Sequence, residues 1–339
     1  MRILLKDSPK TYSPPLHPSF VELVEAVAKI KPHKASEKQP RGTHHTDSPA
    51  YKTFKRWIQA LRERYSPLPP DTTAIVFRFL FPEEDIRRKY ALQETRLAQY
   101  LVKILGVSSE GRGERLKKWQ GEDAIGCLGE EGGSIMSATT QSQASTVCVT
   151  LQQVDALLTE LASKCAYSDS SVHASFVGAP QRRSREAILT TLYTSLTPAE
   201  CAVVTQIILK DLRPLLYPIP TDATHYTAAL LQYKSNAVTT LTKEAAMHAW
   251  DPSGRLSVIY RTRANLEEAT RTYDRLQPGD AMPDPVVGTP IQVSSANTCA
   301  YVRIYSQWVV DPEVREGSEY SASPPPAQRR RQGLGRDKI

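Results

Sequence analysis

The sequence has few cysteines and no long hydrophobic run. No stretch of its 339 residues approaches the roughly 18 consecutive apolar residues that a membrane helix needs. Its five cysteines are widely spaced and form no C-x-x-C pair, so they predict neither a zinc ribbon nor a disulfide framework. This cysteine usage indicates a reducing compartment, the cytosol or the nucleus. The first residues, MRILLKDSP, are too short an apolar stretch for a signal peptide.

Familiar catalytic motifs are also absent. The sequence contains no G-x-x-x-x-G-K-[ST] loop and no G-x-S-x-G turn. His44, His45 and Asp47 are residue types that bind metals, but they stand in a polar, low-complexity segment. A solvated loop is the alternative interpretation of that segment. We therefore expect no catalytic residue and no metal site in this chain.

Apolar residues recur at helical spacing over most of the chain, which predicts an all-α fold. Strand patterns do not alternate with helical ones, which argues against a nucleotide-binding α/β fold. Segment 71–81 fits either a strand or a helix, and its helical neighbours favour a helix. Pro82 then opens the longest predicted helix, over residues 82–106. The other predicted helices cover residues 18–30, 51–65, 150–164, 184–196, 198–212, 225–249 and 262–276.

The pattern predicts one large helical domain over residues 17–282, preceded by a tail at 1–16. An extended linker follows at 283–299, and residues 300–339 form a remnant with a Pro-rich and Arg-rich disordered tail. Segments without helical periodicity are predicted to be irregular or disordered inserts within the domain. These inserts are residues 31–50, 121–147 and 166–183.

Charge is distributed unevenly along the chain. Residues 1–120 carry 23 Lys and Arg against 13 Asp and Glu, whereas residues 121–323 carry 15 against 22. A basic N-terminal third indicates a polyanionic partner, and nucleic acid is the leading candidate. A solvated basic surface is the competing interpretation.

Clusters of cations next to loops are the best candidates for phosphate contacts. They occur at residues 87–89, 112–118 and 182–185. Phosphate binding needs cations held in place, and such contacts position a protein without specifying sequence. Neither a helix-turn-helix nor another base-reading motif accompanies the clusters, so we expect contacts mainly to the DNA backbone and its shape.

Three segments together resemble a known family. They are residues 87–119, 196–213 and 283–293. The first fits R-x-x-Y-x-[LI]-x-E-x-x-L-A, and the second ends in [IL]-[IL]-x-D-L-[KR]. In order and spacing they resemble the N-terminal, all-helical DNA-binding domain of eukaryotic ATP-dependent DNA ligases, most closely the end-joining type, ligase IV, and its fungal relatives. The matching residues are Arg87 or Arg88, Tyr90, Leu92, Glu94, Leu97 and Ala98, then Ile208, Leu209, Asp211, Leu212 and Arg213.

The resemblance implies a domain that lies against the minor groove and helps to encircle nicked or broken duplex DNA. In the family a catalytic domain follows, in which the lysine of a K-x-D-G motif is adenylated with ATP and magnesium. This sequence has no K-x-D-G. The roughly 46 residues after Val293 are too few for a nucleotidyltransferase domain. We therefore expect no autonomous sealing and no cofactor in this chain, since ATP and Mg belong to the full-length family.

The expected function is binding of double-stranded DNA without sequence preference, in break repair by end joining. The expected location is the nucleus, with an end-joining scaffold protein as a further partner and no membrane contact. The family usually continues after the second motif with Gly-[VIL], whereas Pro214-Leu215 follows here, so the phosphate contacts after this helix are expected to differ. The residues expected to contact phosphates are Arg112, Lys117, Lys118, Arg182, Arg183, Lys210 and Arg213.

Two alternatives stay open. One is a helical scaffold that binds protein, with an incidental basic face. The other is a truncated part of an active ATP-dependent DNA ligase. Labelled ATP addresses the second alternative, because this chain is expected to form no covalent lysyl-AMP.

Overall fold

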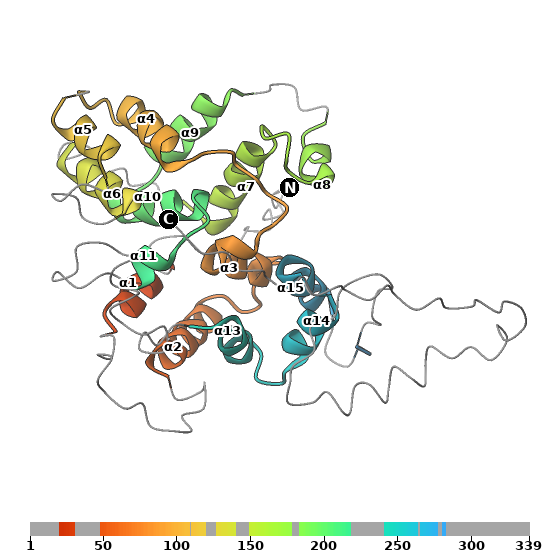
Figure 1. The fold of residues 1–339 in the computed structure, drawn as a ribbon. Coiled ribbons are helices and arrows are strands. Elements are labelled where there is room, and N and C mark those ends of the chain that lie inside the picture. The colour runs from red at the N-terminus through yellow and green to blue at the C-terminus, as the bar shows by residue number, and fades with distance from the viewer. Residues whose placement is uncertain are drawn as a thin grey trace, which may run out of the picture. The chain divides into compact units, whose positions relative to one another are not determined.

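The computed structural model describes residues 20–30, 48–108, 110–119, 127–139, 149–177, 183–217, 241–263, 265–276 and 280–282. These residues fold into 14 α-helices and one 3-10 turn, with no β-strand among them, which confirms the all-α prediction (Figure 1). None of the described helices is long and apolar enough to cross a membrane. The elements are α1 (Val21–Ala28), α2 (Pro49–Arg64), α3 (Thr72–Leu80), η3 (Pro82–Glu84), α4 (Glu94–Ile104), α5 (Arg112–Lys117), α6 (Leu128–Thr139), α7 (Leu151–Ala162), α8 (Ser170–Ala174), α9 (Arg185–Thr194), α10 (Pro198–Ile208), α11 (Arg213–Leu216), α13 (Lys243–Trp250), α14 (Arg255–Arg263) and α15 (Leu266–Arg275).

Helix α3 lies at the centre of the core, packed against α15 and α7 (Figure 1). All of its residues are buried. A helix buried on every side has no polar face, which explains why segment 71–81 fitted a strand as well as a helix. Aromatic rings join α3 to distant helices: the Phe79 ring lies 5.9 Å from that of Phe20, and the Phe77 ring lies 5.7 Å from that of Trp250.

The helix predicted over residues 82–106 is wrong in its first half. Only η3 and the residues from Glu94 onward are helical, and residues 85–93 have no regular structure. The Asp85 carboxylate accepts hydrogen bonds from the backbone nitrogen and Nε of Arg88, at 3.2 and 2.5 Å. Ala91 has a φ of 50°, a left-handed conformation that an α-helix does not contain. Buried polar contacts therefore outweigh local helix propensity in this segment.

The segment predicted to be irregular at residues 121–147 contains α6, so that prediction is wrong for residues 128–139. Glycine disfavours an isolated helix, but here it allows α10 to approach. A Cβ atom at Gly129 would lie 2.5 Å from the backbone oxygen of Ala202, and one at Gly133 would lie 2.6 Å from that of Pro198. Tertiary packing thus favours a helix that its composition does not predict.

Hydrogen-bonded caps mark several predicted helix boundaries in the structure. Thr150 with Gln153 forms a capping box at the start of α7, and Thr197 with Glu200 forms one at the start of α10. The predicted helix over 262–276 corresponds to α15, which Asn265 caps and thereby separates from α14. The insert predicted at 166–183 includes the short helix α8, so it is not irregular throughout.

Other predictions fall partly or wholly outside the described residues. Of the predicted helix over 225–249, the structure describes the part that forms α13, together with Leu241 and Thr242. The tail at 1–16, the linker at 283–299 and residues 300–339 all lie outside the described part.

Candidate nucleic-acid interface

Three of the expected DNA contacts lie exposed on or beside α5. This helix starts after Gly111, which has a φ of 67°, and it is anchored by the fully buried side chain of Leu116. Its outer side carries three exposed cations, which we call the α5 cations: Arg112, Lys117 and Lys118. Lys118 forms an ion pair with Glu114 at 2.7 Å, but both side chains are more than half exposed, and such a pair contributes little to stability. The α5 cations are therefore accessible to a polyanion.

Arg115, in the same basic cluster, forms an ion pair with a neighbouring helix, although its side chain is 48% exposed. It contacts Glu131 Oε1 at 2.8 Å, and the Glu131 side chain on α6 is fully buried. This pair attaches α5 to α6, so Arg115 differs from the α5 cations in having a buried partner on another helix.

The second cluster is also partly engaged within the fold. Arg182 lies outside the described residues. Arg183 binds both carboxylate oxygens of Glu160, with 3.0 Å between Nε and Oε1, and its Nη1 donates to Thr191 Oγ1 at 3.3 Å. This hydrogen bond to Glu160 raises the pKa of the Arg183 guanidinium. Arg183 therefore holds the start of α9 against α7.

Lys210 follows α10 and is directed into the domain. Its Nζ donates to the backbone oxygen of Asp85 at 3.0 Å, contacts Asp85 Oδ2 at the same distance, and lies 5.0 Å from the centre of the Tyr90 ring. Burial lowers the pKa of Lys210 to about 8, in spite of the Asp85 carboxylate, and the positive charge of Arg88 lowers it further. The structure thus places Lys210 in an internal contact.

Lys210 belongs to a buried ionic network that the sequence analysis missed. Burial alone would raise the pKa of Asp85, but the charges of Arg88 and Lys210 lower it to about 2. Arg88 also contacts Asp155 Oδ1 on α7 at 2.8 Å, and its side chain is only 2% exposed. Arg78 on α3 extends the network, at 3.6 Å from Asp155 Oδ2 and 3.7 Å from Glu267 Oε1 on α15. The network therefore joins the irregular segment 85–93 to the central helices.

Arg213 lies at the start of α11 and is both paired and exposed. It binds Asp211 in a bidentate way, at 2.7 Å from Oδ1 and 2.8 Å from Oδ2, and its side chain is 61% exposed. Pro214, which departs from the family pattern, lies in the first turn of α11. Proline lacks a backbone N–H, but the first turn of a helix makes no intrahelical hydrogen bond with that group. Arg213 is thus a candidate phosphate contact whose geometry Asp211 fixes.

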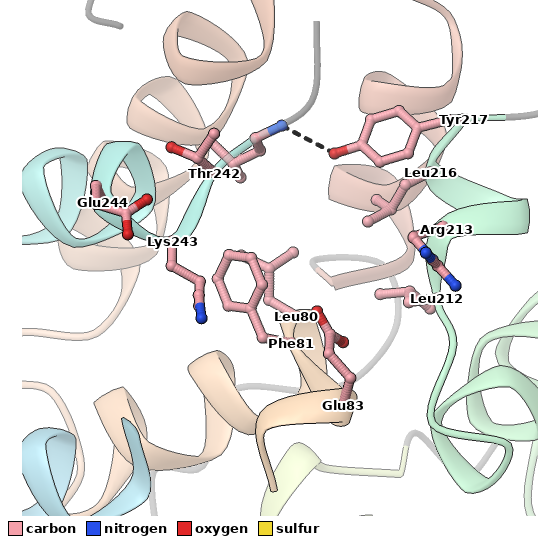
Figure 2. Close-up of a pocket in the computed structure, with 11 residues that line it drawn as sticks. Leu80, Phe81, Glu83, Leu212, Arg213, Leu216, Tyr217, Thr242, Lys243 and Glu244 are labelled. Atoms are coloured by element: carbon pink, nitrogen blue, oxygen red, sulfur yellow. Dashed lines mark hydrogen bonds between the residues drawn. The ribbon is translucent and has the colours of Figure 1, made fainter. Parts of the chain in front are cut away.

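A pocket of about 280 Å³ opens beside Arg213, between α3, α11 and α13 (Figure 2). In Figure 2 the Tyr217 hydroxyl accepts a hydrogen bond from the backbone nitrogen of Leu241, at 2.9 Å. Exposed Glu83 and Glu244 contribute negative charge to its lining, and Arg213 and Lys243 contribute positive charge. Its apolar walls come from Leu80, Phe81, Leu212 and Leu216.

These features define an all-helical domain that presents exposed cations from a short surface helix, while Arg78, Arg88 and Lys210 form ion pairs within the fold. The family model for the DNA ligase N terminus matches residues 18–216. The chain therefore belongs to the family of N-terminal domains of ATP-dependent DNA ligases. A comparison with curated proteins finds no match. The matched region ends with α11 and includes the α5 cations.

The residues present do not fit the ATP and magnesium chemistry of a ligase. The sequence has no K-x-D-G motif, and the described residues contain no group of three His, Cys, Asp or Glu side chains able to hold a metal ion.

Proposed function

We propose that this chain binds double-stranded DNA without sequence preference, as the N-terminal domain of an ATP-dependent DNA ligase. The observation that carries the proposal is the family match over residues 18–216, which includes a surface helix with three exposed cations. Exposed Lys and Arg neutralise phosphates whatever the base sequence, so contacts of this kind bind duplexes in general.

The α5 cations and Arg213 are the proposed phosphate contacts, because all four side chains are exposed. For Lys210 and Arg183 we propose a positioning role, since Asp85 and Glu160 bind them within the fold. Arg182 stays among the proposed contacts on the sequence alone.

We further propose that the ligase is of the end-joining type, similar to ligase IV and its fungal relatives, and that it acts in break repair in the nucleus. The support is the order and spacing of the motifs at residues 87–119, 196–213 and 283–293. Sealing would need ATP, magnesium and a lysine that ATP adenylates.

Neutralising two α5 cations should weaken DNA binding equally on unrelated sequences. We expect Arg112→Gln with Lys117→Gln to reduce the slope of log affinity against log salt by about two, because each lost phosphate contact removes about one. Fluorescence anisotropy with two labelled duplexes of unrelated sequence measures both quantities. The matched control is Lys52→Gln with Lys55→Gln on the exposed side of α2, which should change the slope less. Equal slopes for the parent chain and the α5 variant would contradict the assignment.

A second function, binding to a protein partner, is favoured by the pocket beside Arg213. An apolar side chain would fit the apolar walls. A basic residue beside that side chain would contact Glu83 or Glu244, because the two cations of the lining, Arg213 and Lys243, already pair with Asp211 and Glu84. Reversing both charges, with Glu83→Lys and Glu244→Lys, should abolish capture of such a partner from nuclease-treated nuclear extract while leaving duplex affinity at or above that of the parent chain. Capture that is unchanged in the variant would exclude the pocket as the contact.

A further inference from the structure

A second, wider pocket of about 390 Å³ lies on another part of the domain. Three segments that are distant in sequence build it: residues 89–93, the turn that contains Cys165 and Tyr167, and residues 208–210 at the end of α10. We call it the Tyr167 pocket. Its volume falls within the range of ligand-binding pockets in proteins.

The walls of the Tyr167 pocket are held in place by hydrogen bonds between two of these segments. The backbone nitrogen of Lys89 donates to Ser168 Oγ at 3.0 Å, and the backbone nitrogen of Asp169 donates to the oxygen of Arg87 at 2.9 Å. Ser168 Oγ also lies 2.7 Å from the backbone oxygen of Ala162, at the end of α7. These contacts fix the turn that carries Tyr167 against the segment that carries Lys89.

Two residues that line the pocket have left-handed backbone conformations, which raise the conformational free energy of any residue other than glycine. Ala91 has a φ of 50° and Lys210 a φ of 62°. Such conformations persist only where the surrounding structure enforces them, and they cluster at binding sites. For Lys210, one such surrounding contact is the ion pair of its Nζ with Asp85 Oδ2 at 3.0 Å.

The side chains of the Tyr167 pocket combine an exposed aromatic ring with positive charge. Tyr167 is 85% exposed, so a base can reach its ring. Lys89 is exposed as well, whereas the Nζ of Lys210, which also lines the pocket, is held by Asp85. None of the described residues that line the pocket is acidic. Proteins that bind single-stranded nucleic acid pair a ring, on which a base stacks, with cations that contact its phosphate.

We propose that the Tyr167 pocket binds an unpaired nucleotide of a DNA end, with its base stacked on Tyr167 and its phosphate beside Lys89. The proposal rests on the proposed function, since it assigns a place for the single-stranded part of a DNA end. It adds that the domain distinguishes an end with an overhang from a blunt one.

Binding of the full chain to a blunt duplex and to the same duplex with a short single-stranded overhang tests this proposal. We expect the overhang to bind more tightly. Tyr167→Ala should remove the excess affinity, a loss of roughly 5- to 150-fold for one stacked base. Tyr167→Phe should keep it, because phenylalanine retains the ring. Lys89→Gln should reduce the excess affinity for the overhang. The matched surface change Lys52→Gln on α2 should leave the ratio of overhang affinity to blunt-duplex affinity unchanged.

The outcomes separate this proposal from the proposed function. The ratio of the affinity for the overhang duplex to the affinity for the blunt duplex is the quantity to compare. If it is the same in the parent chain and in Tyr167→Ala, the Tyr167 pocket is not the site. If the parent chain does not bind the blunt duplex, the proposed function is contradicted instead. The pocket is then tested by measuring how the same variants bind a single-stranded oligonucleotide. Deoxyadenosine monophosphate can be added as a competitor of the overhang. If it displaces the overhang from the parent chain but not from Tyr167→Ala, the pocket also binds free nucleotides. Overhang binding without such competition shows that it needs a continuous strand.

Discussion

Gly133→Ala is expected to destabilise the domain by about 3 kcal/mol, the upper part of the usual range for overpacking. A Cβ atom at this position would lie 2.6 Å from the backbone oxygen of Pro198 on α10. A backbone oxygen cannot rotate away as the end of a side chain can, so α6 and α10 would have to separate. These two helices form the most extensive helix pair among the described elements. Thermal unfolding should show a fall in Tm of roughly 6–12 °C.

Gly132→Ala is the matched control, because it makes the same chemical change one residue away. A Cβ atom there would meet Leu101 Cδ1 at 3.5 Å and Cys201 Sγ at 3.7 Å, which are ordinary contacts. Replacing a glycine within a helix also recovers about 0.5–1 kcal/mol of backbone entropy. We expect Gly132→Ala to leave Tm unchanged or slightly raised. Equal losses for the two variants would show that the close approach of α10 to Gly133 is not what matters.

Arg88→Met is expected to cost about 3–5 kcal/mol, as is usual when one partner of a buried ion pair is removed. The change leaves Asp85 and Asp155 without their shared guanidinium, and Asp85 is only 1% exposed. Methionine keeps much of the volume of the arginine stem, so lost charge rather than a cavity should dominate. Urea unfolding followed by circular dichroism measures the free energy of unfolding.

Lys118→Met is the corresponding control at the surface, because it breaks the exposed pair with Glu114. Such exposed pairs contribute little to stability, so the urea midpoint should hardly move. A small effect of Arg88→Met, similar to that of Lys118→Met, would mean that the buried ionic network does not hold segment 85–93 in place.

Helices with one apolar face and a recognisable cap were predictable from the sequence. The capping box of Thr197 and Glu200 is local, and so are the apolar positions of α7 and α10. The irregular segment 85–93 was not predictable, because its conformation depends on Asp155 and Lys210, which lie far away in the sequence. Helix α6 was missed for a similar reason: Gly129 and Gly133 disfavour a helix locally and stabilise one only when α10 packs against them.

The candidate interface, too, could be predicted from the sequence only in part. Sequence identified the basic clusters, and the structure shows why their members differ. Arg115 faces the buried Glu131 and Arg183 faces Glu160, whereas Lys117 is exposed on the surface. Charge along the sequence does not reveal which cations have internal partners, because those partners come from other helices. The Tyr167 pocket was not visible in the sequence either, since three separate segments form it.

The salt dependence of duplex binding by the full chain tests the central claim most directly. If the α5 cations and Arg213 contact phosphates, log affinity should fall linearly with log salt between about 50 and 200 mM, with a slope of about −3 to −4 that is the same for unrelated duplex sequences. Absence of duplex affinity at low salt, or an affinity that does not respond to salt, would contradict the account.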